Sequence, residues 1–120
     1  MAQSIIGDKS LAFAKRIAKC YRFLKDKKDE TVMSKQLLRC GTSIGANVRE
    51  GQYAQSKKDF ISKMNIALKE AGETDYWLDV ILSAEYFTDE EYNSLDTDNK
   101  ELIRMLASIV KTSKEKESLG

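Results

Sequence analysis

The chain has 120 residues, which is enough for one domain, spanning residues 1–120, with a core of its own. It contains no proline, which favours long uninterrupted helices, and no histidine, which removes the commonest general base and metal ligand. No signal-peptide pattern and no run of eighteen apolar residues occurs. The sequence therefore predicts a helical cytoplasmic protein without a membrane partner.

The formal net charge of +1 conceals two halves of opposite sign. Residues 1–69 carry 15 basic and 6 acidic side chains, whereas residues 70–120 carry 5 basic and 13 acidic ones. Such an asymmetry suits self-association between unlike surfaces, or a basic face that binds a polyanion. The alternative is that the two halves neutralise each other within one bundle.

The first helix is predicted over residues 8–25, where apolar side chains recur at spacings of four, three and four residues. These side chains are Phe13, Ile17, Cys20 and Leu24. We interpret Cys20 and Cys40 as small buried hydrophobic residues of a protein in a reducing compartment, and not as a disulfide.

The second helix is predicted over residues 30–51, with Asp29 as its N-cap. It contains the segment GTSIGANVREG, residues 41–51, and apolar periodicity runs straight through that segment. Gly51 follows the last periodic residue, so we expect it to cap the helix C-terminus in the left-handed region.

The third helix is predicted over residues 57–86, with Ser56 as N-cap and a heptad seam along its length. The fourth is predicted over residues 89–115, opened by a capping box from Thr88 to Glu91, with a fraying tail beyond it. Four helices joined by connections of about three to five residues should form an all-α, antiparallel up-down-up-down four-helix bundle.

The glycine-containing segment does not match a phosphate-binding loop. A P-loop needs four residues between its glycines and a lysine after them, whereas Gly41 and Gly45 have three residues between them. A mid-helix glycine costs roughly 1 kcal/mol relative to alanine, and close approach of a neighbouring helix would offset that cost. We therefore interpret the segment as a packing surface. Ser43 and Asn47 share one side of it, where they could hydrogen-bond to a neighbouring helix.

Carboxylates Glu70 and Glu73 of the third helix, or backbone groups, are the expected partners of that polar pair. The acidic side chains Glu50, Glu70, Glu73 and Asp75 are otherwise interpreted as solvated acids or ion-pair partners of Arg39 and Arg49. Two cysteines without histidine do not supply the four ligands typical of a structural zinc site, and neither cysteine has a partner base. The sequence predicts no catalytic residue, no metal and no cofactor.

Basic side chains recur at helical spacing on the first two helices and at the start of the third. Such stripes neutralise phosphates in a salt-dependent way that is largely independent of sequence, although any solvated helix face can look similar. The candidate nucleic-acid-binding residues are Lys15, Arg16, Lys19, Arg22, Lys35, Arg39, Arg49, Lys57 and Lys58.

The third helix carries apolar or aromatic residues over a wider arc than a small bundle can bury, which predicts a homo-oligomer. The candidate assembly and packing residues are Gly41, Ser43, Gly45, Asn47, Glu50, Gly51, Glu70, Glu73 and Trp77.

The run LLRCGTSIGANVREG…SKKDF…IALKEAGETDYWL resembles the 23S rRNA-intervening-sequence protein family of bacterial four-helix-bundle proteins. The shared pattern comprises Leu38-Arg39, Ser43-Ile44, Asn47-Val48, Glu50-Gly51, Ser56, Asp59-Phe60, Ala67, Glu70 and Glu73. The chain departs from the pattern at Gln55, where many relatives have arginine, and it is less basic than many of them.

This resemblance implies small four-helix bundles that assemble as ring-shaped homopentamers and have no enzymatic activity. Members are encoded within large-subunit ribosomal RNA genes of some bacteria. The family is similar to the accessory protein of diversity-generating retroelements, which binds a reverse transcriptase and nucleic acid. We expect a homopentamer that binds or scaffolds structured RNA or an RNA-associated protein. The alternatives are a protein–protein adaptor with no nucleic-acid role and a small-molecule carboxylate site between subunits.

Overall fold

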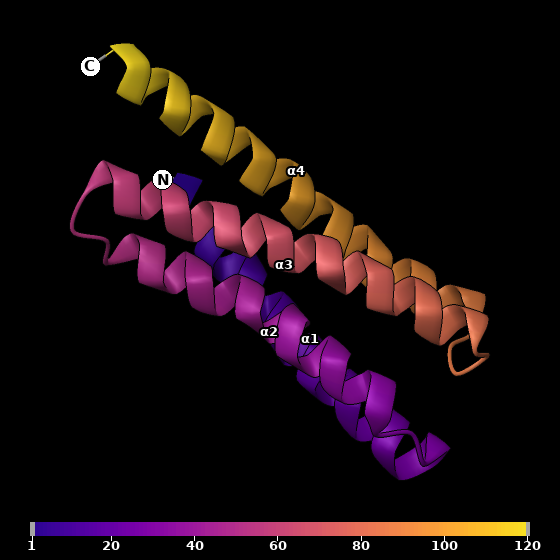
Figure 1. Cartoon of the computed structure of the whole chain (residues 1–120). Helices are drawn as coiled ribbons and strands as arrows, with labels where there is room; N and C mark the ends of the chain where they lie inside the picture. The colour runs from indigo at the N-terminus through magenta and orange to yellow at the C-terminus, as the bar shows by residue number, and fades with distance from the viewer. Residues whose placement is uncertain (1, 120) are drawn as a thin grey trace.

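Four long helices lie side by side in the computed structural model, which describes residues 2–119 and the side chains of residues 5–118 (Figure 1). They are α1 (Ala2–Lys28), α2 (Val32–Gln52), α3 (Lys57–Ser83) and α4 (Asp89–Leu119). Residues 29–31, 53–56 and 84–88 connect them, so that successive helices run in opposite directions. Within the described range there are no strands, and the predicted all-α four-helix bundle is confirmed.

The bundle extends 52 × 21 × 21 Å along its principal axes. Each helix packs against the next along the chain, and α4 returns to α1 with the least extensive of the four contacts. Across the diagonals, α1 with α3 and α2 with α4, no Cα atoms among the described residues approach within 8 Å. The side chains that fill the middle include Phe13, Ile17, Leu24, Leu37, Ile44, Met64, Leu78, Ile81, Leu102 and Leu106.

Several helix ends differ from the expected ones by a few residues, and two of the differences have identifiable reasons. α1 begins at Ala2, six residues before the predicted start, and Ile6 and Ser10 extend its buried side toward the N-terminus. α3 ends at Ser83 because Glu85 takes a left-handed φ of 67°, which lets the Tyr86 N–H donate to the Ile81 carbonyl at 3.2 Å.

The N-caps of α3 and α4 are the predicted ones. The Asp59 N–H donates to the Ser56 hydroxyl at 3.0 Å. At α4 the Glu91 N–H donates to the Thr88 hydroxyl at 3.1 Å, and the Glu91 carboxylate accepts from the Thr88 N–H at 2.8 Å. The helix continues to Leu119, past the expected end at residue 115. The tail that was expected to fray beyond residue 115 is therefore helical up to Leu119, and Gly120 lies outside the described residues.

The predicted Asp29 cap of α2 is wrong. Asp29 adopts φ 55°, a left-handed conformation that aspartate tolerates, and so it terminates α1 instead. The neighbouring Glu30 caps α2: its carboxylate accepts from the backbone N–H groups of Val32, Met33 and Ser34 at 3.0, 2.8 and 2.8 Å. Burial raises the pKa of Glu30, but these hydrogen bonds outweigh burial and leave the pKa below its ordinary value.

The substitution Glu30→Gln should lower the free energy of unfolding by about 1 kcal/mol at neutral pH, a typical cost for losing an N-cap. Because the folded state lowers the Glu30 pKa, the carboxylate stabilises the fold above the unfolded carboxyl pKa. That stabilisation is lost as the pH falls through the folded pKa. The wild-type and variant stabilities should therefore converge as the pH falls below the ordinary glutamate pKa of about 4.3.

Urea unfolding of both proteins at neutral and acidic pH measures this difference. Glu117→Gln, an exposed change in the last turns of α4, is the control and should have no effect at either pH. A stability difference that does not change with pH would contradict the role of the Glu30 charge.

Candidate nucleic-acid and assembly surfaces

The Gly41–Gly51 segment is continuous α-helix within α2, and its first two glycines allow α1 to approach closely. A Cβ atom added to Gly41 would lie 2.9 Å from Cγ1 of Ile17. One added to Gly45 would lie 3.1 Å from the backbone carbonyl oxygen of Ser10. Both distances are shorter than an ordinary carbon contact, so side chains here would push the helices apart. These two glycines thus lie where α1 and α2 are closest, as expected of a packing surface.

Gly51 does not cap α2 as predicted. It lies inside the helix, which ends at Gln52, and no described glycine has a positive φ. An added Cβ would lie 2.5 Å from Cε of Met64, a residue of α3. Gly51 is therefore a third packing glycine, and it serves the α2–α3 contact instead of a turn.

Among the described residues, Ser43 and Asn47 form none of the cross-helix hydrogen bonds expected of them. The Asn47 amide donates to the Ser43 carbonyl at 2.9 Å within α2, because the neighbouring turn of its own helix offers the nearest acceptor. Glu70 and Glu73 have another partner, Arg39.

The cluster around Arg39 joins α2 to α3. The Arg39 guanidinium binds the Glu70 carboxylate at 3.1 Å and also the Glu73 carboxylate, which accepts from the Trp77 indole N–H at 3.2 Å. The Arg39 hydrogen bond is the main reason that the pKa of Glu73 lies below its usual value. Arg39, Glu70 and Glu73, which were predicted for nucleic-acid binding or assembly, thus link two helices of one chain, whereas the Trp77 hydrogen bond lies within α3.

Glu50, another predicted assembly residue, also lies at the α2–α3 contact. Its carboxylate oxygen is 3.6 Å from the Lys63 ammonium nitrogen of α3. The Glu50 side chain is 60% exposed, so this ion pair contributes little to stability.

The predicted basic residues fall into two groups in the structure. Arg16 donates to Asp98 at 2.6 Å and to Ser94 at 2.7 Å, so it joins α1 to α4, as Arg39 joins α2 to α3. The other seven are exposed and form no ion pair with any described residue: Lys15, Lys19, Arg22, Lys35, Arg49, Lys57 and Lys58.

These seven cations do not form one continuous patch. Lys57 and Lys58 begin α3 at one end of the bundle, whereas Lys35 lies near the start of α2, at the other end (Figure 1). The 17 residues of α2 that follow Lys35, residues 36–52, separate them by roughly 26 Å at 1.5 Å per residue. We define the α1–α2 basic face as Lys15, Lys19, Arg22 and Lys35.

Both cysteines are free thiols. Burial, followed by the charge of Glu91, raises the pKa of Cys20 to about 12, and burial also raises the pKa of Cys40. Both thiols are therefore protonated at neutral pH. In residues 2–119 no group of histidine, cysteine, aspartate and glutamate has the geometry of a metal site. None of the described helices is long and apolar enough to cross a membrane.

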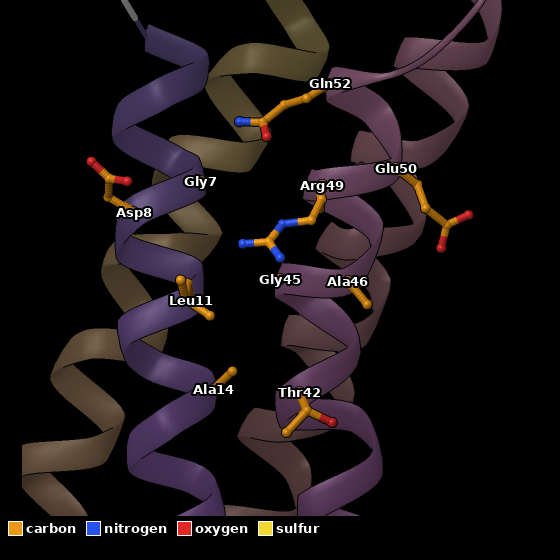
Figure 2. A pocket seen from close by; sticks show the side chains of 10 residues that line it. All are labelled: Gly7, Asp8, Leu11, Ala14, Thr42, Gly45, Ala46, Arg49, Glu50 and Gln52. Carbon is orange, nitrogen blue, oxygen red and sulfur yellow. The ribbon is translucent and has the colours of Figure 1, made fainter.

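A hollow of about 560 Å³ opens between α1 and α2, next to the packing glycines (Figure 2). Leu11 and Ala14 project into it from α1, and the Arg49 guanidinium reaches in from α2. Gly45 and Ala46 line its α2 side, where their small size leaves the space unfilled. We call this feature the α1/α2 hollow; sequence spacing predicted the small residues but not the hollow beside them.

These features define a class of protein: a small up-down-up-down bundle whose second helix carries glycines where its neighbours approach. The sequence pattern of the 23S rRNA-intervening sequence protein family matches residues 2–108. The chain belongs to this family, and the resemblance is confirmed.

The chain is also similar to a solved structure, that of a protein of unknown function from the S23 ribosomal protein family of Bacteroides thetaiotaomicron. The two sequences are 54% identical and the structures superpose with a TM-score of 0.91, covering 92% of this chain and 99% of the other. No match was found among curated proteins.

Proposed function

We propose that this protein is a non-enzymatic, homo-oligomeric cytoplasmic module that binds or scaffolds structured RNA or an RNA-associated protein. A pentamer is the assembly expected from the resemblance to the family. The observation that carries the proposal is the α1–α2 basic face, whose cations have no acidic partner among the described residues.

The contrast with the paired arginines gives this observation its weight. Carboxylates of α3 and α4 form ion pairs with Arg39 and Arg16, respectively. Lys15, Lys19 and Arg22 follow one another at spacings of four and three, so they lie along one side of α1 and repel each other. Phosphates along a nucleic-acid backbone would relieve this repulsion and release counterions on binding.

The double substitution Lys15→Glu with Lys19→Glu should weaken binding to a structured RNA about tenfold or more at roughly 50 mM salt. The helix content should not change, because both side chains are exposed and make no ion pair with the described residues. A fluorescence titration at several salt concentrations measures both the affinity and its salt dependence. Removal of two phosphate contacts should also make the salt slope shallower.

Lys111→Glu with Lys114→Glu is the matched control, since these two exposed lysines lie on α4, away from the basic face. Equal losses in both double variants would mean that net charge alone, and not this face, governs binding.

The second candidate is a protein–protein adaptor with no nucleic-acid role. Exposed apolar side chains favour it, including Tyr53 at 82%, Val32 at 76% and Tyr76 at 59% exposure. The same titration decides between the two, because the adaptor predicts no measurable affinity for RNA even at about 50 mM salt, where phosphate contacts count most.

A further inference from the structure

Gly72 differs from the other glycines in the interior of α2 and α3. An added Cβ at Gly72 would meet no heavy atom within 4 Å, whereas at Gly41, Gly45 and Gly51 it would meet a neighbouring helix at 2.9, 3.1 and 2.5 Å. A mid-helix glycine costs about 1 kcal/mol relative to alanine. Close packing offsets that cost at the other three positions, but nothing in the described chain does so at Gly72.

Gly72 lies in a row of exposed side chains on α3, which we call the α3 ridge: Ile66, Lys69, Gly72 and Tyr76. Lys69, Gly72 and Tyr76 follow at spacings of three and four, so they share the outer side of the helix. Tyr76 is 59% exposed and Ile66 is 39% exposed. The Tyr76 ring stands edge-on to Trp77, with centroids 5.1 Å apart, which holds it in place.

The α1/α2 hollow has the complementary features. Its wall is low at Gly45, and it exposes 38% of Leu11. Arg49 projects into it, and Asp8 lies at its outer margin on α1 with its carboxylate on the side away from α2 (Figure 2). Asp8 and Arg49 form no ion pair with the residues described here, and the same is true of Lys69 on the ridge.

We propose that the α3 ridge of one copy docks in the α1/α2 hollow of a second copy. This rests on the homo-oligomeric part of the proposed function and names the surfaces that produce it. Lys69 gains Asp8 as its counter-ion across the interface, and the Tyr76 ring gains the Arg49 guanidinium. Gly72 lets the partner's helices approach the α3 backbone, which accounts for a glycine at an otherwise open position.

Ridge and hollow lie on different sides of the same molecule, because α3 is diagonal to α1 in the bundle. Each copy therefore presents both halves of the contact, and the association is heterologous. A heterologous contact repeats from copy to copy and closes into a ring when the rotation between neighbours permits it.

Light scattering on the purified full chain at micromolar concentration tests this contact. Lys69→Glu should weaken association at least tenfold and lower the mass toward that of a monomer, and Asp8→Lys should do the same. The double variant Lys69→Glu with Asp8→Lys swaps the two charges and should restore the mass. Gly72→Leu should also lower the mass while leaving far-UV circular dichroism intact.

Lys111→Glu is the control and should leave the oligomer unchanged. If the ridge variants keep the wild-type mass, the docking proposal is wrong, although the homo-oligomer stands. If Lys69→Glu dissociates the protein and Asp8→Lys does not rescue it, the hollow is not the receiving surface and the proposal is equally overturned. A wild-type protein that is monomeric at micromolar concentration would remove both the assembly and this contact, without affecting the RNA titration.

Discussion

Replacing Gly45 with leucine should lower the free energy of unfolding by about 2–3 kcal/mol. An added Cβ would lie 3.1 Å from the carbonyl oxygen of Ser10 and 3.3 Å from its carbonyl carbon. These are backbone atoms of α1, so they can yield only if the whole helix moves. The gain in helix propensity, roughly 0.8 kcal/mol, is too small to compensate for that movement.

Urea unfolding followed by far-UV circular dichroism measures the effect. Ala12→Leu, an exposed change on α1 that adds similar volume, is the control and should alter stability by no more than about 0.5 kcal/mol. If Gly45→Leu proved as stable as the wild type, α1 and α2 could not be as close in solution as the structure places them.

The helical nature of the Gly45 segment was predictable from sequence, because apolar residues keep their spacing on both sides of the glycines. The role of Gly51 was not. A glycine that follows the last periodic residue has the same sequence signature whether it ends the helix or admits a neighbour. Only the position of Met64, thirteen residues later and on another helix, distinguishes the two.

Asp29 and Glu30 illustrate a second limit. Aspartate is a good N-cap and also tolerates the left-handed conformation that ends a helix, so its presence between two helices is ambiguous. In the structure Asp29 adopts the left-handed conformation and ends α1. The Glu30 side chain, which is longer, accepts hydrogen bonds from three backbone N–H groups at the start of α2.

The basic residues show why the candidate surfaces were harder to predict than the fold. Helical spacing placed Arg16 and Lys19 in one stripe, but it carries no information about acids that approach from distant parts of the sequence. Asp98 lies 82 residues after Arg16, and Glu70 lies 31 residues after Arg39. Ion pairs over such separations depend on the packing of the helices, and they decide which cations stay available.

Asn99 is a polar residue among the buried side chains of α4, and its hydrogen bonding shows the energetic cost of that position. The side chain is fully buried, and its amide nitrogen donates to the Ala71 carbonyl of α3 at 3.0 Å. Its Oδ1 atom has no hydrogen-bond partner among the residues that the structure describes. A buried acceptor without a partner costs about 1–3 kcal/mol, more than a single hydrogen bond usually contributes.

Asn99→Leu should therefore raise the free energy of unfolding by about 1–2 kcal/mol. Leucine has nearly the same length, removes the unpaired oxygen and adds apolar contact to the core. The Ala71 carbonyl loses only an additional donor, because it already belongs to the hydrogen-bond ladder of α3. Urea unfolding of the variant and the wild type measures the gain.

Comparison with Asn99→Ala distinguishes the effect on stability of removing the polar group from the effect of keeping the core filled. It eliminates the same oxygen but leaves a cavity, so it should lower stability by about 1–2 kcal/mol. Asn93→Leu, an exposed change one and a half turns earlier on α4, should have little effect. If leucine and alanine at position 99 destabilised the protein equally, Oδ1 would have to be satisfied in solution, with a buried water as the simplest partner.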